Sequence, residues 1–154
     1  MRALLKSFLY AFRGILAAVK TQRNMRIHIT AAVYVTAFSF FYDLTRTEYV
    51  LLALTFGAVM SCEMINTAVE AAVDISSPDY SEKAGFAKDA AAGAVLVAAI
   101  FAVVVGVLLF GDIAVIKEIF RYYGSHIPAL VGLICSFGAA WVFVFGSSKN
   151  KRDE

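Results

Sequence analysis

Four apolar stretches alternate with polar segments along the chain. The two longest, Ala90 to Gly111 and Ile127 to Gly146, contain 22 and 20 residues without a charged side chain, and a helix needs about 20 such residues to cross a bilayer. Ile27 to Tyr42 is shorter, but Arg26 before it can extend its charged group toward the membrane surface. Tyr49 to Cys62 continues into a further helical segment. The pattern therefore predicts four membrane-spanning helices.

The segment before the first span is predicted to be an amphipathic helix in the membrane interface. Its large apolar residues recur at helical spacing, whereas Lys6, Arg13 and Lys20 follow one another at intervals of seven on the other side. We therefore divide the chain into an interfacial helix at 1–26, a core of three spans at 27–116, an additional C-terminal span at 127–146 and a cytoplasmic tail at 147–154.

Composition and charge support an all-α integral membrane protein. Apolar residues make up 60% of the chain and its mean hydropathy is +0.73, which is too high for a soluble domain. The first 26 residues contain six basic side chains and no acidic one, which places the N-terminus in the cytoplasm. Four crossings return the C-terminus to the same side. Topology and anionic lipid account for the basic N-terminus, so nucleic acid is not an expected partner.

A polar stripe follows the second apolar stretch. Glu63, Asn66, Glu70 and Asp74 fall within about 80° of one another on a helix, and Lys88 with Asp89 opens the third span. Ionisable side chains at membrane depth usually mark function. This mixture suits phosphoryl transfer, in which carboxylates hold Mg²⁺, a cation contacts phosphate and a base takes a proton. A proton or cation pathway, or hydrogen bonding between helices, would use the same stripe.

Three motifs resemble one known family. They are Glu63-x-x-Asn66-Thr67-Ala68-x-Glu70-x-x-Val73-Asp74, then Ala87-Lys88-Asp89 with Ala94-Val95-Leu96, and Tyr10-x-x-Arg13-Gly14-x-x-Ala17-Ala18. From about Tyr10 to Gly111 the chain is similar to the small bacterial membrane diacylglycerol kinases, which include undecaprenol kinases. The resemblance implies a homotrimeric lipid kinase of the bacterial cytoplasmic membrane, with ATP as co-substrate, Mg²⁺ as cofactor and each active site shared between protomers.

The resemblance also implies a role for each matched residue. Glu63 corresponds to the catalytic base that deprotonates the lipid hydroxyl, and Glu70 to a glutamate that holds the metal. Six matched residues correspond to positions of the nucleotide site, with Lys88 at the phosphates and Tyr10 at the adenine; they are Tyr10, Asn66, Glu70, Asp74, Lys88 and Asp89. Without the motif, Asn66 would be interpreted as a hydrogen bond between helices, and Tyr10 is also compatible with an interfacial anchor.

Two departures from the family pattern bear on function. Gln22 stands where the family carries a metal-binding glutamate, and its amide oxygen can bind Mg²⁺ but brings no charge. Two alternatives to an active kinase are therefore an inactive lipid-binding homologue and a small membrane protein that conducts protons or cations. The chain also adds the span Ile127 to Gly146, in which Gly132, Ser136 and Ala140 have a spacing suited to close helix packing. The segment Arg23 to His28 resembles the undecaprenol branch, so undecaprenol is the favoured substrate and diacylglycerol the second.

Overall fold

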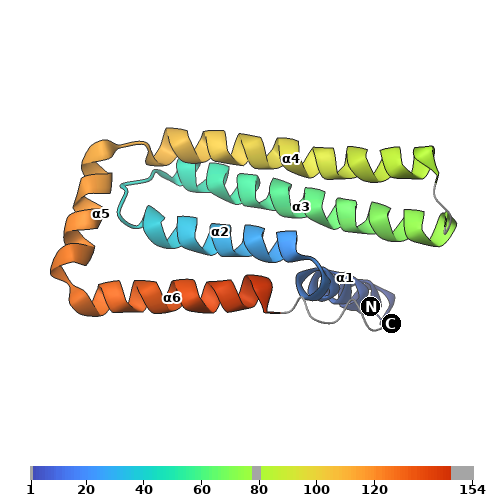
Figure 1. Ribbon diagram of the computed structural model, residues 1–154, viewed down its shortest axis with the longest axis horizontal. Helices are drawn as coiled ribbons and strands as arrows, with labels where there is room; N and C mark the ends of the chain where they lie inside the picture. The colour runs from blue at the N-terminus through green and yellow to red at the C-terminus, as the bar shows by residue number, and fades with distance from the viewer. Residues whose placement is uncertain (1, 78–80, 147–154) are drawn as a thin grey trace.

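The computed structural model describes residues 2–77 and 81–146, and this part of the chain forms six α-helices joined by short connections (Figure 1). In chain order they are α1 (Arg2–Thr21), α2 (Arg23–Ser39), α3 (Arg46–Ser76), α4 (Glu82–Phe110), α5 (Ile113–Ser125) and α6 (Ile127–Phe145). The predicted all-α membrane fold is confirmed. The tail predicted at 147–154 lies outside the described residues.

Four helices run side by side along the length of the molecule, in the order α4, α3, α2, α6 (Figure 1). The most extensive contact is the antiparallel pair of α3 and α4, and α2 packs between α3 and α6. Helix α5 crosses one end of this row, and α1 lies at the other end beside the start of α2. The end of α3, the start of α4 and the last turn of α6 lie at the same end as α1.

Three of these helices, α3, α4 and α6, are long and apolar enough to cross a membrane. Helix α2 has 17 residues and is about 25 Å long, somewhat less than the roughly 30 Å hydrocarbon core. It begins at Arg23 because Gln22 adopts an extended backbone between α1 and α2. The interfacial helix therefore ends at Thr21, and the residues from Arg23 to Arg26 form the first turn of the next helix.

Local signals explain where the helices at the other end begin. Thr45 and Glu48 form a capping box, in which the Glu48 carboxylate accepts a bond from the Thr45 amide at 2.6 Å. The Asp112 carboxylate accepts a bond from the Ala114 amide at 2.8 Å and caps α5. With these caps, α3 and α5 begin directly after short turns. The short turns bring the ends of α2 and α4 close to α5.

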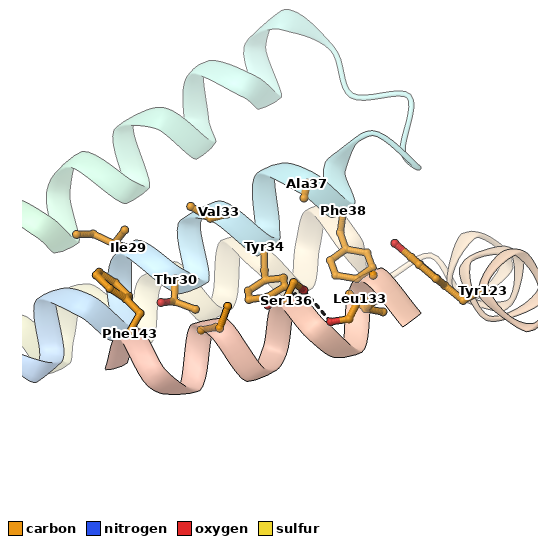
Figure 2. Close-up of a pocket in the computed structure, with 13 residues that line it drawn as sticks. Ile29, Thr30, Val33, Tyr34, Ala37, Phe38, Tyr123, Leu133, Ser136 and Phe143 are labelled. Atoms are coloured by element: carbon orange, nitrogen blue, oxygen red, sulfur yellow. Dashed lines mark hydrogen bonds between the residues drawn. The ribbon is translucent and has the colours of Figure 1, made fainter. Parts of the chain in front are cut away.

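Helix α6 lies beside α2, and a groove of about 560 Å³ runs between the two helices (Figure 2). The predicted small residues Gly132, Ser136 and Ala140 all line this groove. The Tyr34 hydroxyl lies 3.0 Å from the Ser136 hydroxyl, and the Tyr34 ring stacks on Phe137 with centroids 4.9 Å apart. Helix α6 thus lies on the side of α2 that points away from α3, but a Cβ added at Gly132 would meet nothing within 4 Å, so the small residues face a groove and not a close helix contact.

Candidate active site

Two buried polar side chains of α3 define the candidate site. Glu63 is 1% exposed and Asn66 is 6% exposed, although most of α3 is apolar and open to the surroundings. Both line a cavity of about 250 Å³ between α2, α3 and α4, together with Asn24, His28 and Ala92. The larger groove between α2 and α6 contains none of the predicted site residues. The site therefore lies within the helices of the predicted three-span core.

Hydrogen bonds within the stripe leave specific oxygens free. The Asn66 amide group donates to the Glu70 carboxylate at 3.0 Å, which is the i, i+4 spacing of one helix face. Within the described part of the chain, Glu63 Oε2 and Asn66 Oδ1 are buried and accept no hydrogen bond. An unpaired buried polar atom costs about 1–3 kcal/mol. These two oxygens are therefore available to a substrate hydroxyl, a metal ion or a water molecule.

The nucleotide-site candidates Asp74 and Lys88 form an ion pair between the end of α3 and the start of α4. Their side chains are 66% and 38% exposed, so water screens the attraction. Asp74 lies about three turns from Glu63 along α3, toward the end of that helix. The structure thus brings Lys88 and the stripe onto one surface of the α3–α4 hairpin.

The other predicted site residues are more open. Tyr10 on α1 is 63% exposed, and Asp89 on α4 is exposed as well. Gln22 is half-buried at the junction of α1 and α2, where its side chain makes no capping bond. A single copy of the described chain therefore does not enclose Tyr10 or Asp89.

Arg26 and His28 of α2 also lie in this region, although neither was predicted as a site residue. Arg26 was expected to extend toward the membrane surface, but it is 3% exposed, and its Nε finds no partner among the described residues. That expectation was wrong, because Arg26 is buried in the structure and does not extend to the surface. His28 lines the Glu63 cavity. The helical spacing between Asn24 and His28, one turn apart, is the signal that could have placed His28 there.

The oxygen ligands at the site fit a magnesium ion that is bound partly by the substrate. Among residues 2–77 and 81–146, no three His, Cys, Asp or Glu side chains gather into a metal site. Mg²⁺ usually takes only one or two protein carboxylates and completes its shell with phosphate and water. Glu70 supplies a carboxylate, and the unpaired Oδ1 of Asn66 supplies a neutral oxygen beside it. This set suits Mg²⁺ bound together with a nucleotide.

The fold and the site define a helical membrane protein with a carboxylate-rich centre at one end of a three-helix core. Residues 9–110 match the prokaryotic diacylglycerol kinase family. This chain belongs to that family, and it is a multi-pass membrane lipid kinase with ATP as its co-substrate. The match covers α2, α3, α4 and most of α1, whereas α5 and α6 lie beyond it.

Individual relatives carry two different names. The chain is 40% identical over 105 residues to an undecaprenol kinase of Bacillus subtilis, a segment covering 68% of this chain and 85% of that protein. It is 48% identical over 104 residues to a diacylglycerol kinase of Synechocystis, covering 67% of this chain and 59% of that protein. The chain is 32% identical over 106 residues to a diacylglycerol kinase of Escherichia coli, a segment covering 69% of this chain and 87% of that protein.

Proposed function

We propose that this protein transfers the γ-phosphoryl group of ATP directly to undecaprenol at the cytoplasmic face of a bacterial membrane. The observation that carries the proposal is the buried Glu63 carboxylate, whose Oε2 faces no protein donor while the side chain lines a cavity between the spans. A base in that position can reach a hydroxyl group that enters from the membrane. Structural bonding between helices would instead have left both oxygens paired.

We favour undecaprenol over diacylglycerol because of one segment of the chain. The segment from Arg23 to His28 resembles the undecaprenol branch, and the Bacillus subtilis relative named for this activity aligns over most of its own length. Diacylglycerol is the second candidate because the Synechocystis relative named for it has the higher identity. Both substrates present a hydroxyl group at the interface above apolar tails, so the reacting atoms would be the same.

In the proposed reaction, Glu63 Oε2 takes the proton of the lipid hydroxyl while the hydroxyl oxygen bonds to the γ-phosphorus of ATP. The bond from that phosphorus to the oxygen bridging the β-phosphate breaks, and ADP leaves. Lys88 would contact the phosphates, with Asn66, Asp74, Asp89 and Tyr10 completing the nucleotide site. Positioning both substrates at one interface would supply much of the rate enhancement.

Magnesium would neutralise phosphate charge during the transfer. Glu70 would hold it, assisted by Asn66 Oδ1 and, at the junction of α1 and α2, by Gln22. An amide oxygen carries no charge, so Gln22 would bind the ion more weakly than a glutamate in its place.

The inferred setting follows from charge and from the family resemblance. Basic residues of α1 and of the α3–α4 hairpin would face the cytoplasm, with α5 on the outer surface. The exposure of Tyr10 and Asp89 in one copy supports a homotrimer in which a neighbouring protomer completes each site.

The test is transfer of labelled γ-phosphate from ATP and Mg²⁺ to undecaprenol and, separately, to diacylglycerol in mixed micelles. Undecaprenyl phosphate formed by the unmutated chain, and not by Glu63→Gln, is the expected result. A preference for diacylglycerol would correct the substrate. If a folded, oligomeric protein phosphorylates neither lipid, the cation conductor and the inactive homologue become the better interpretations.

A further inference from the structure

Two more cavities follow the Glu63 cavity along α2 and α4. The first has about 300 Å³ and shares His28 and Ala99 with the Glu63 cavity. The second has about 430 Å³ and shares Val35 and Gly106 with the first. Because neighbouring cavities share their lining residues, the three form one row that starts at Glu63.

This row crosses nearly the whole membrane. Along α4 it extends from Ala92 in the Glu63 cavity to Phe110 in the last one, which is about 27 Å of helix. The hydrocarbon core of a bilayer is about 30 Å thick. A lipid that is confined to one leaflet would therefore occupy only the half of the row nearest Glu63.

The walls of the row are apolar beyond His28. Small residues of α2 and α4 leave room between the helices, among them Ala32, Ala102 and Gly106. The Thr55 hydroxyl in the same wall donates to the Leu51 carbonyl of its own helix at 2.7 Å, so it presents no unpaired donor. This mostly apolar lining suits a hydrocarbon chain.

Helix α5 closes the far end of the row. Ile116, Ile119 and Phe120 line the last cavity, and α5 crosses the bundle there (Figure 1). The end is tied together by Tyr42, whose hydroxyl donates to the Phe110 carbonyl at 3.0 Å. Phe120 is 76% exposed and has surface available for an apolar ligand. None of α5 belongs to the segment that matches the family.

We infer that the row of cavities holds the hydrocarbon tail of the lipid alcohol and that α5 is the end wall that selects for tail length. The inference rests on the proposed function, which puts the hydroxyl group at Glu63. It identifies the preferred substrate class as a single-chain alcohol with a tail longer than one leaflet. A shorter tail cannot reach α5 and gains no contact with Ile119 or Phe120.

Photo-crosslinking tests the location of the tail without requiring catalysis. The full chain in lipid bilayers is incubated with a long polyprenol that carries a diazirine at the end farthest from the hydroxyl group, and is then illuminated and digested. The label is expected on the peptide that contains Ile116 to Phe120, while a short prenol with the same group should label residues of α2 or α4. Label on lipid-facing residues such as Phe101, or on α6, overturns the inference.

Turnover tests the selection for length. Ile119→Trp fills the last cavity, and its matched control Ile113→Trp adds the same bulk at an exposed position of α5 that does not line the row. The ratio of kcat/KM for a long prenol to that for a short prenol should fall about tenfold or more in Ile119→Trp, and should not change in the control. Phe120→Ala removes contact area without adding bulk and should lower the same ratio. It replaces Ile119→Trp as the test if that variant does not fold.

The two experiments separate this inference from the proposed function. If the tail label reaches α5 but no lipid alcohol is phosphorylated, the proposed kinase reaction is wrong and the tail site is supported. If prenols are phosphorylated while α5 stays unlabelled and the ratio is the same in all variants, the kinase stands and the end wall is wrong.

Discussion

Lys88 at the start of α4 is paired with Asp74 near the end of α3, across the connection between the two helices. The pair is exposed and therefore worth less than about 1 kcal/mol. A nucleotide phosphate can consequently compete with the Asp74 carboxylate for the amine. Under the proposed function, Asp74 would hold Lys88 near the phosphate position until ATP binds.

Lys88→Ala should lower kcat/KM for ATP at least a hundredfold, because it removes a cation from the developing phosphate charge. Asp74→Asn should lower it by less than about tenfold, since the variant loses the weak pair with Lys88 but keeps a side-chain oxygen at the nucleotide site. Both are measured with saturating lipid, with thermal unfolding in detergent as the control for folding. Equal losses in the two variants would show that Lys88 acts only through Asp74.

Glu63→Gln should lower kcat by about 10²–10⁴-fold, the usual contribution of a general base. The amide has nearly the same shape as the carboxylate and fits the same buried position, so the protein should remain folded. Single-turnover phosphorylation checks this, with binding of a non-hydrolysable ATP analogue as the control. An active Glu63→Gln variant would assign the proton transfer to another group.

Much of the fold was predictable because membrane spans have a simple pattern. The uncharged stretches of α4 and α6 are long enough for the bilayer, and the stripe on α3 follows helical spacing, so the sequence predicted both helices and the shared face. The break at Gln22 was not predictable in the same way. No glycine or proline marks it, and basic residues continue on both sides of it.

The burial of individual polar residues depended on packing between helices. Periodicity placed Glu63 and Asn66 on one face, but only the packed structure shows that they are covered while Asp74 on the same face is exposed. Arg26 shows the same limitation. Its position beside an apolar stretch suggested an extended side chain at the surface, whereas it is buried in the structure.

Gln22→Glu should lower the Mg²⁺ concentration for half-maximal activity several-fold, because a carboxylate adds a charge to the metal site. Gln22 is also the residue before the first turn of α2, where an acidic side chain favours the helix. Gln22→Ser is the matched control, since serine caps a helix well but brings no charge. If the serine variant shows the same gain, the effect comes from the helix and not from metal binding.

Ser136→Ala should weaken the attachment of α6 to α2 without reducing lipid phosphorylation. Ser136 donates its only proton to the Leu133 carbonyl at 2.7 Å, so the Tyr34 hydroxyl is the donor in their 3.0 Å contact (Figure 2). Hydrogen bonds of this kind between membrane helices contribute about 0.6 kcal/mol on average. A double-mutant cycle with Tyr34→Phe, read from unfolding in detergent, should give a coupling energy of that size. A large loss of phosphorylation in Ser136→Ala would instead show that α6 takes part in building the active site.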